Sequence, residues 1–310
     1  MIQQFDNLMQ LFRAFPDEQA AIDHLTAIRW AGGKFCPLCG NADEERIGRM
    51  KVAGVETNTY KCYACRKRFS IKVGTIFQDT KLPLRTWFAA IWMITNHPKG
   101  IASTTLAKDL GITQKTAWFV LHRLRHAART DSFNAPLSGD VEIDETFVGC
   151  KETNKHKSKK LNKGRGSVGK TPVLGMVERN GHVRAGIIPD VRKATLHGII
   201  RNHVAEGSNI YTDEHAGYRG LDGYNHHTTS HLAGVYVIDG HNHTNSIESV
   251  WALLKRQIVG VHHWVSPKHL DRYVGEMTYR LNRREMTVGE LVNDLLANST
   301  GRLTYKALIS

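Results

Sequence analysis

The chain has 310 residues, 41% of them hydrophobic, so it is long enough to bury more than one hydrophobic core. Its longest apolar run, at 87–94, is far shorter than the roughly 20 residues of a membrane-spanning helix, and the N-terminus lacks the basic and apolar regions of a secretory signal. A formal net charge of +13 favours a polyanionic partner such as nucleic acid, although general solubility could also account for it.

The first predicted elements are two helices within residues 1–30. Apolar side chains recur at helical spacing over 4–29, and Pro16 with Asp17 marks the start of the second helix. We expect these helices to pack and to carry no chemistry.

Four of the five cysteines come next, as two C-x2-C pairs: Cys36 with Cys39, and Cys62 with Cys65. Two such pairs can complete a closed tetrahedral shell around one structural Zn²⁺. Short alternating segments around a glycine lie between the pairs and suit the hairpin of a zinc ribbon, which we place at 31–78. The alternatives are reduced buried cysteines or a redox pair. Zinc binding should supply much of the folding free energy of so small a module.

Residues 79–130 show the pattern of a helix-turn-helix. An apolar-patterned helix breaks at Gly111, and Thr113 is placed to cap a longer helix. In that motif the start of the second helix enters the DNA major groove. The residues predicted to face DNA are Thr113, Gln114, Lys115 and Thr116 toward the bases, with Arg123 and Arg125 toward phosphates. Many three-helix units share the pattern without binding DNA, and this alternative stays open.

Three acidic residues punctuate the next region, 138–286, which follows a linker-like segment at 128–139. Asp144 lies in a predicted strand at 140–148, and Asp213 closes another short β-branched run. Glu248 falls in the first turn of a predicted helix at 245–258. Carboxylates from two strands and a helix suit hard divalent cations, and two such ions about 3.5–4 Å apart can promote displacement at phosphorus.

The elements between the acids predict an α/β core. Two strands are joined by the Asn-Gly turn at 179–181, a helix ends at Gly207, and residues 234–240 are a candidate last strand. The basic segment 151–170 reads as a solvated loop beside the acids. Strand, hairpin, helix, strand and helix is the order of a ribonuclease-H-like domain. Residues 287–310 are expected to form a tail with a short helix.

Glu248 also has a purely structural interpretation. Asn245 followed three residues later by Glu248 is the pattern of a capping box, in which the glutamate accepts a backbone N–H. Lys255 lies nearly two turns beyond Glu248 on the same helix face, where it could orient a phosphate or be an ordinary surface lysine. Neighbouring histidines at 226–227, 241–243 and 262–263 are not expected to converge on a metal.

Taken together, these motifs resemble the insertion-sequence DDE transposases of the ISXO-like kind. The resemblance runs from about Arg29 to Arg284, and its most specific stretches are HTNSIESVWALLKR and SPKHLDRYVGEMTYRLNRR. It implies a multidomain α+β protein with a ribonuclease-H-like catalytic domain. In that domain Asp144, Asp213 and Glu248 would bind two Mg²⁺ or Mn²⁺ ions, with Lys255 as an associated basic residue.

The resemblance also implies a reaction. Water would attack the phosphodiester at the element end, and the resulting 3′-hydroxyl would attack target DNA. The expected partners are double-stranded DNA, as terminal inverted repeats and target, and further copies of the chain in a dimer or larger assembly. A cytoplasmic, nucleoid-associated protein with no membrane contact is expected. Two alternatives remain, namely a DNA-binding regulator with an inactive domain and a metal-dependent nuclease without strand transfer.

Overall fold

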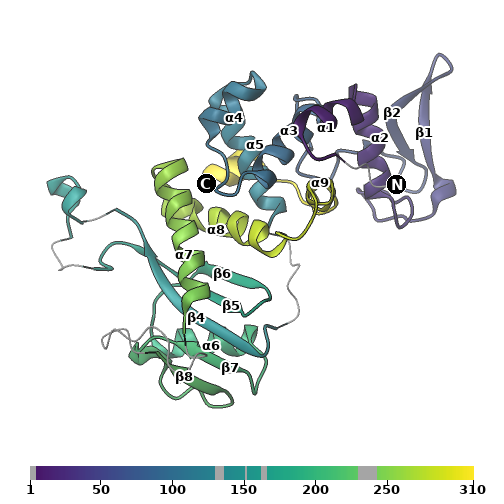
Figure 1. The fold of residues 1–310 in the computed structure, drawn as a ribbon. Coiled ribbons are helices and arrows are strands. Elements are labelled where there is room, and N and C mark those ends of the chain that lie inside the picture. Colours follow the sequence, from purple (N-terminus) through teal and green to yellow (C-terminus); the bar gives the residue numbers. More distant parts are fainter. Residues whose placement is uncertain (1–4, 130–135, 151, 162–165, 230–242) are drawn as a thin grey trace. The chain divides into compact units, whose positions relative to one another are not determined.

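The computed structural model describes residues 5–129, 136–150, 152–161, 166–229 and 243–310. The chain divides into two compact units, Met1–Thr130 together with Glu285–Ser310, and Asp131–Arg284 (Figure 1). The candidate last strand at 234–240 lies outside the described residues. None of the described helices combines the length and the apolar character needed to cross a membrane.

The first unit is mainly helical. Local sequence explains where its helices begin and end: the side chain of Asp17 accepts the backbone N–H of Ala20, that of Thr113 accepts the N–H of Thr116, and Gly111 ends a helix at φ +63°. Its helices are α1 (Leu8–Ala14), α2 (Glu18–Arg29), α3 (Leu84–Asn96), α4 (Ser103–Leu110), α5 (Gln114–Ala127), α9 (Val288–Ala297) and α10 (Tyr305–Ile309). The segment expected to be a tail therefore forms two helices of this unit.

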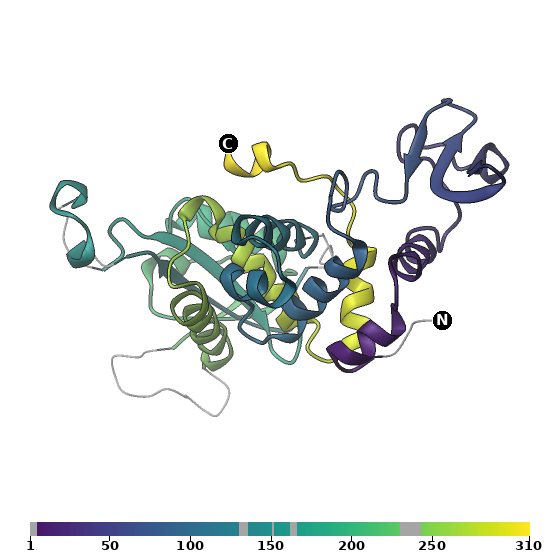
Figure 2. The same cartoon turned by 90° about the horizontal axis from the view of Figure 1, so that it is seen from above.

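A small antiparallel sheet of β1 (Ile47–Val52), β2 (Val55–Cys62) and β3 (Arg68–Ser70) holds the cysteines. Figures 1 and 2 show it at one end of the first unit, next to α2. Ala53 and Gly54 join β1 to β2 with positive φ at both positions, as tight hairpin turns require. The core of this sheet is tiny, with Ile47, Tyr60 and Phe69 packed against the buried Cys36 and Cys62.

The helix pair α4–α5 occupies the region predicted to be a helix-turn-helix, and its inward residues are buried as expected: Ala117, Val120, Leu121 and Leu124. Gln114 and Lys115 are exposed at the start of α5, and Thr116 is half-buried. Arg123, in contrast, is only 6% exposed, and it donates hydrogen bonds to the carbonyls of Ile76 (2.8 Å) and Leu303 (3.1 Å). This placement disagrees with the predicted phosphate contact of Arg123, because its guanidinium is buried and donates its hydrogen bonds to backbone carbonyls inside the unit. Arg125 is buried as well.

The second unit contains a five-stranded sheet within the described residues, in the order β6-β5-β4-β7-β8. Its strands are β4 (Asp140–Val148), β5 (Thr171–Glu178), β6 (Val183–Ile187), β7 (Asn209–Thr212) and β8 (Asn225–Thr228). Strand β5 pairs antiparallel with both β6 and β4, whereas β7 pairs parallel with both β4 and β8. The predicted strand 140–148 and the turn at Asn180, with φ +62°, are confirmed. Strand β8 was not predicted, because its sequence NHHT has no apolar pattern and it pairs only as an edge.

Helices cover both faces of this sheet (Figure 1). Side chains of α7 (Asn245–Gln257) and α8 (Pro267–Asn282) form one core with β5 and β6. Side chains of α6 (Lys193–His203) form another core with the opposite faces of β4 and β5. A π-helical turn at Ile258–His262 follows α7, and short 3-10 turns occur at Glu152–Asn154, Lys157–Lys159 and Ala216–Tyr218. Trp251, Leu254 and Ile258 are buried, as their spacing predicts.

Strand alternation decides which side chains of β4 meet α7. Asp144 pairs with Gly175 of β5 in the strand register and shares its face. A Cβ on Gly175 would lie 2.6 Å from ring atoms of Trp251, closer than real carbon contacts allow. The missing side chain thus lets α7 approach the sheet closely at the position of Asp144.

Candidate functional site

Asp144 lies on β4 beneath α7 and is partly buried. Its Oδ2 accepts a hydrogen bond from Nε1 of Trp251 at 2.8 Å. Burial, followed by the negative charges of Glu145 and Asp213, raises the pKa of Asp144 to about 6. Such a carboxylate favours binding of a cation, because the positive charge would compensate both for its burial and for the repulsion from Glu145 and Asp213.

Asp213 reaches the same region from β7. The parallel register pairs Glu142 with Tyr211, and Asp213 follows directly after β7, which ends at Thr212. Asp213 lies close enough to Asp144 for its charge to contribute to the raised pKa of Asp144. Beyond the strand, Oδ1 of Asp213 accepts the backbone N–H of His215 at 3.0 Å, which turns the chain away. The sheet therefore brings together two aspartates that are 69 residues apart in the sequence.

Glu145 is a third acid in this neighbourhood, and the sequence analysis did not include it in the site. It points to the face opposite Asp144, as alternation requires, and there its Oε2 accepts the hydroxyl of Tyr218 at 2.5 Å. Burial, with added repulsion from Asp213, raises the pKa of Glu145. The adjacent acidic pair 144–145 was the signal in the sequence, but only the fold shows that both carboxylates are partly buried and near Asp213.

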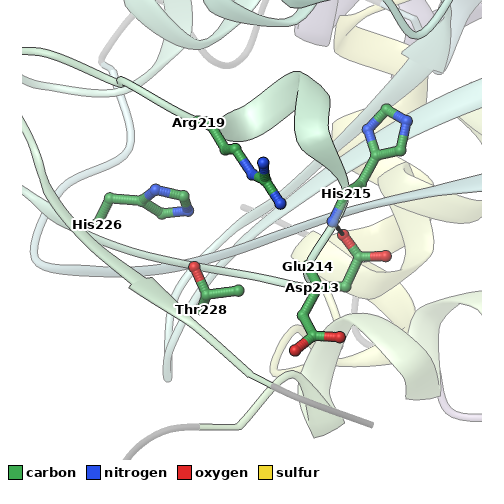
Figure 3. A pocket seen from close by; sticks show the side chains of 6 residues that line it. All are labelled: Asp213, Glu214, His215, Arg219, His226 and Thr228. Carbon is green, nitrogen blue, oxygen red and sulfur yellow. Dashed lines mark hydrogen bonds between the residues drawn. The ribbon is translucent and has the colours of Figure 1, made fainter. Parts of the chain in front are cut away.

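A cavity of about 640 Å³ opens beside Asp213. Its lining residues are Asp213, Glu214, His215, Arg219, His226 and Thr228. Figure 3 shows the side chains of His226 and Arg219 across the cavity from the two carboxylates. The histidine of β8 thus lines a space next to Asp213 rather than forming a cluster with its neighbour in sequence.

Glu248 is exposed in the first turn of α7. The predicted capping box does not match the helix start, because Thr244 is the N-cap and Asn245 is already helical. The N–H groups of Ser246 and Ile247 are instead accepted by Glu142, which was not predicted to act here. Lys255 is exposed about two turns further along α7.

The four cysteines form a compact group, and within the described part of the chain it is the one set of three or more metal-binding side chains whose ligand atoms all lie within 4.8 Å of one another. The Sγ atoms of Cys36 and Cys65 are 3.8 Å apart, as are those of Cys39 and Cys62. Zinc–sulfur bonds of about 2.3 Å in a tetrahedron place sulfur atoms about 3.8 Å apart, so the group fits structural zinc. The backbone N–H of Cys65, helped by that of Ala64, lowers the pKa of Cys62 to about 7 and so favours the thiolate that zinc requires.

Comparison with known proteins agrees with both parts of this description. Residues 136–282 match the model of the ISXO2-like transposase domain, and residues 16–68 match that of the transposase zinc-ribbon domain. A Halobacterium salinarum protein described as an uncharacterized protein in transposable element ISH50 is 30% identical over 281 residues, which cover 86% of this chain and 91% of that protein. The chain belongs to the ISXO2-like transposases.

The ISXO2-like transposase is also similar, over less of its length or more weakly, to a second protein and to a solved structure. An uncharacterized transposase-like protein of Haemophilus influenzae is 30% identical over 102 residues, covering 32% of this chain and 80% of that one. Among solved structures, a pre-cleavage Mos1 transpososome aligns with 70% of this chain and 80% of its own, at 11% identity and a TM-score of 0.25.

Proposed function

We propose that this ISXO2-like transposase cuts DNA at the ends of its element and joins the resulting 3′-hydroxyl groups to target DNA. The observation that carries the proposal is the placement of Asp144 on β4, beneath the helix that bears Glu248, with Asp213 directly after the end of the parallel strand β7. Three antiparallel strands continued by two parallel ones, with helices on both faces, support a ribonuclease-H-like domain.

Asp144, Asp213 and Glu248 would hold two Mg²⁺ or Mn²⁺ ions, and their oxygen donors suit these hard cations. Such ions supply activation of an attacking oxygen and stabilisation of the leaving one. Asp144, partly buried and beside other acids, is the residue whose charge most needs that compensation.

Basic side chains near the acids would position the DNA backbone. Arg219 lines the cavity beside Asp213, and Lys255 projects from α7 beyond Glu248. Both can pair with phosphate oxygens. The three residues Asp144, Asp213 and Glu248 are called the acid set below. In the first unit, the zinc ribbon and the start of α5, with Gln114 and Lys115 exposed and Thr116 half-buried, are proposed to recognise the terminal inverted repeats. Bringing two DNA ends together calls for a dimer or a larger assembly.

The central experiment replaces Asp213 with Asn in the full chain. Cleavage of element-end DNA in Mg²⁺ should be lost while binding to the same DNA is retained, because the change removes a carboxylate charge and leaves the binding unit untouched. Asp222→Asn is the matched control, since Asp222 is an exposed aspartate of the same unit outside the acid set. Unchanged cleavage by the Asp213 variant would remove this residue from the mechanism.

A second assay separates the transposase from its alternatives. Wild-type protein, Mg²⁺ and donor DNA with a free 3′-hydroxyl end are incubated with plasmid. Joined product supports the proposal, nicking without joining indicates a nuclease, and binding without either indicates a regulator.

A further inference from the structure

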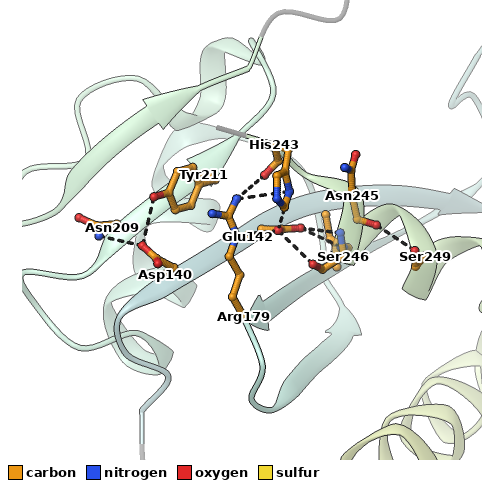
Figure 4. Close-up of polar contacts among 10 residues, drawn as sticks. Asp140, Glu142, Arg179, Asn209, Tyr211, His243, Asn245, Ser246 and Ser249 are labelled. Atoms are coloured by element: carbon orange, nitrogen blue, oxygen red, sulfur yellow. Dashed lines mark hydrogen bonds and ion pairs between the residues drawn. The ribbon is translucent and has the colours of Figure 1, made fainter. Parts of the chain in front are cut away.

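Glu142 is a fully buried carboxylate that neither zinc binding nor the acid set uses. It accepts hydrogen bonds from the backbone N–H groups of Ser246 (2.8 Å) and Ile247 (3.1 Å), and from the Ser246 hydroxyl (3.1 Å) (Figure 4). It also pairs with Nε of Arg179 at 2.9 Å and lies 3.2 Å from Nδ1 of His243. A buried charge is tolerated only with such partners, so this cluster fixes the start of α7 against the middle of the sheet.

Arg179 extends the cluster to a third element. It comes from the turn between β5 and β6, lies 4.0 Å from the ring centroid of Tyr211 on β7, and donates to the carbonyl of His243 at 2.8 Å. The Tyr211 hydroxyl in turn donates to Asp140 at 3.1 Å. Figure 4 shows these side chains bridging β4, β7 and the start of α7.

The three acids lie on, or directly after, the three elements joined by this cluster. In each, the acid comes two residues after a member of the cluster: Glu142 and Asp144, Tyr211 and Asp213, Ser246 and Glu248.

A second contact fixes how far α7 slides along β4. Glu142 accepts the backbone N–H of Ile247, and Asp144 accepts the indole N–H of Trp251. Two strand residues advance about 6.6 Å and four helical residues about 6 Å, so the two carboxylates match the two donors on the helix.

We propose that the buried Glu142–Arg179 pair is a positioning element that sets the relative placement of Asp144, Asp213 and Glu248. This inference rests on the proposed function, because it assigns the pair a role in cleavage. A buried ion pair adds little stability compared with apolar residues of the same shape, whereas it does define one arrangement of the groups it joins. The pair therefore matters more for the geometry of the acids than for the stability of the unit.

The test compares full-length Glu142→Gln with the double variant Glu142→Gln/Arg179→Met. The single change keeps the shape but leaves Arg179 without its carboxylate, so both the melting temperature and the cleavage rate should fall. Replacements of side chains that orient metal ligands typically lower metal affinity or activity by about 10–100-fold. The double variant removes both charges and should recover melting temperature without recovering cleavage. Recovery of both would show that the pair is merely structural and would overturn the proposal.

Two further measurements complete the design. Amide exchange in the magnesium-free protein should speed up at Ser246 and Ile247 in Glu142→Gln while β5 keeps its protection, and unchanged exchange at the start of α7 would contradict the proposal. Val204→Ala is the control, since Val204 is buried in the core on the other face of the sheet. If this control, at an equal loss of melting temperature, cleaves as poorly as Glu142→Gln, the positioning role fails. Absence of both cleavage and joining by the wild type would instead defeat the proposed function itself, so the two failures are distinguishable.

Discussion

Replacing Gly175 with Ala tests how closely α7 must approach the acids. The new Cβ would lie 2.6 Å from two ring atoms of Trp251 and 2.7 Å from Cδ1 of Ile247. Carbon atoms in ordinary contact are about 3.5–4.0 Å apart, so α7 would have to move by about 1 Å. The hydrogen bond from Trp251 to Asp144 is 2.8 Å long, and a displacement of that size would take it out of range.

Two magnitudes follow from this displacement. Overpacking costs about 1–3 kcal/mol, which exceeds the gain of about 0.4–1 kcal/mol that alanine brings by restricting the unfolded chain. The unit should therefore be less stable. A misplacement of about 1 Å in a catalytic arrangement can lower the rate by about 100-fold, equivalent to about 2.7 kcal/mol in the activation free energy.

The assay measures the melting temperature and the rate of end cleavage for Gly175→Ala beside Gly186→Ala. Gly186 lies on the neighbouring strand β6, where an added Cβ meets nothing within 4 Å, so that variant should match or slightly exceed the wild type in stability. If Gly175→Ala behaves like Gly186→Ala in both measurements, the close approach of α7 is not required and the reasoning fails.

Three other outcomes are expected. Metal analysis of the wild type should find one zinc ion per chain, Cys36→Ser should lose it, and retention of that ion would argue against the four-cysteine site. Arg123→Met should destabilise the first unit by about 1–3 kcal/mol in denaturant unfolding, because two buried carbonyls lose their donors. Lys115→Ala should cost at most about 1 kcal/mol, since the Lys115 ammonium lies only over the Tyr305 ring, and should weaken DNA binding. Asp144→Asn should stabilise the magnesium-free protein by up to about 3 kcal/mol at pH 7.5 but not at pH 4. The pKa of Asp144 is about 6 in the folded protein against the usual 3.8, so the free-energy cost of burying its charged form appears only as pH rises from about 4 to above 6. Equal stabilisation at both pH values would contradict this assignment.

Much of the local structure could be predicted from the sequence. The C-x2-C spacing, the cap at Thr113, the strand 140–148 and the Asn-Gly turn at 180–181 each depend on residues close together in the chain, and the structure has them where the patterns place them. The family could also be inferred, since its motifs are short and contiguous.

The fates of individual charged residues were less predictable. An exposed, DNA-facing arginine and a buried one look alike in a helical pattern, so Arg123 was assigned to phosphate. Its partners prove to be carbonyls at Ile76 and at Leu303, the latter 180 residues away. The sequence assigned no role to Glu142, because nothing near it in the chain shows that it accepts the N–H of Ser246, 104 residues further on.

The sequence by itself determined the cysteine spacing that suits a metal and most of the strands and helices, since ligand chemistry and backbone preferences act over a few residues. Only the tertiary structure decided which of those segments meet. The close contact of α7 with Gly175, the neighbouring positions of Asp144 and Asp213, and the burial of Glu142 all depend on pairing between distant strands. Such pairing is selected by the packing of the whole core, and no local pattern encodes it.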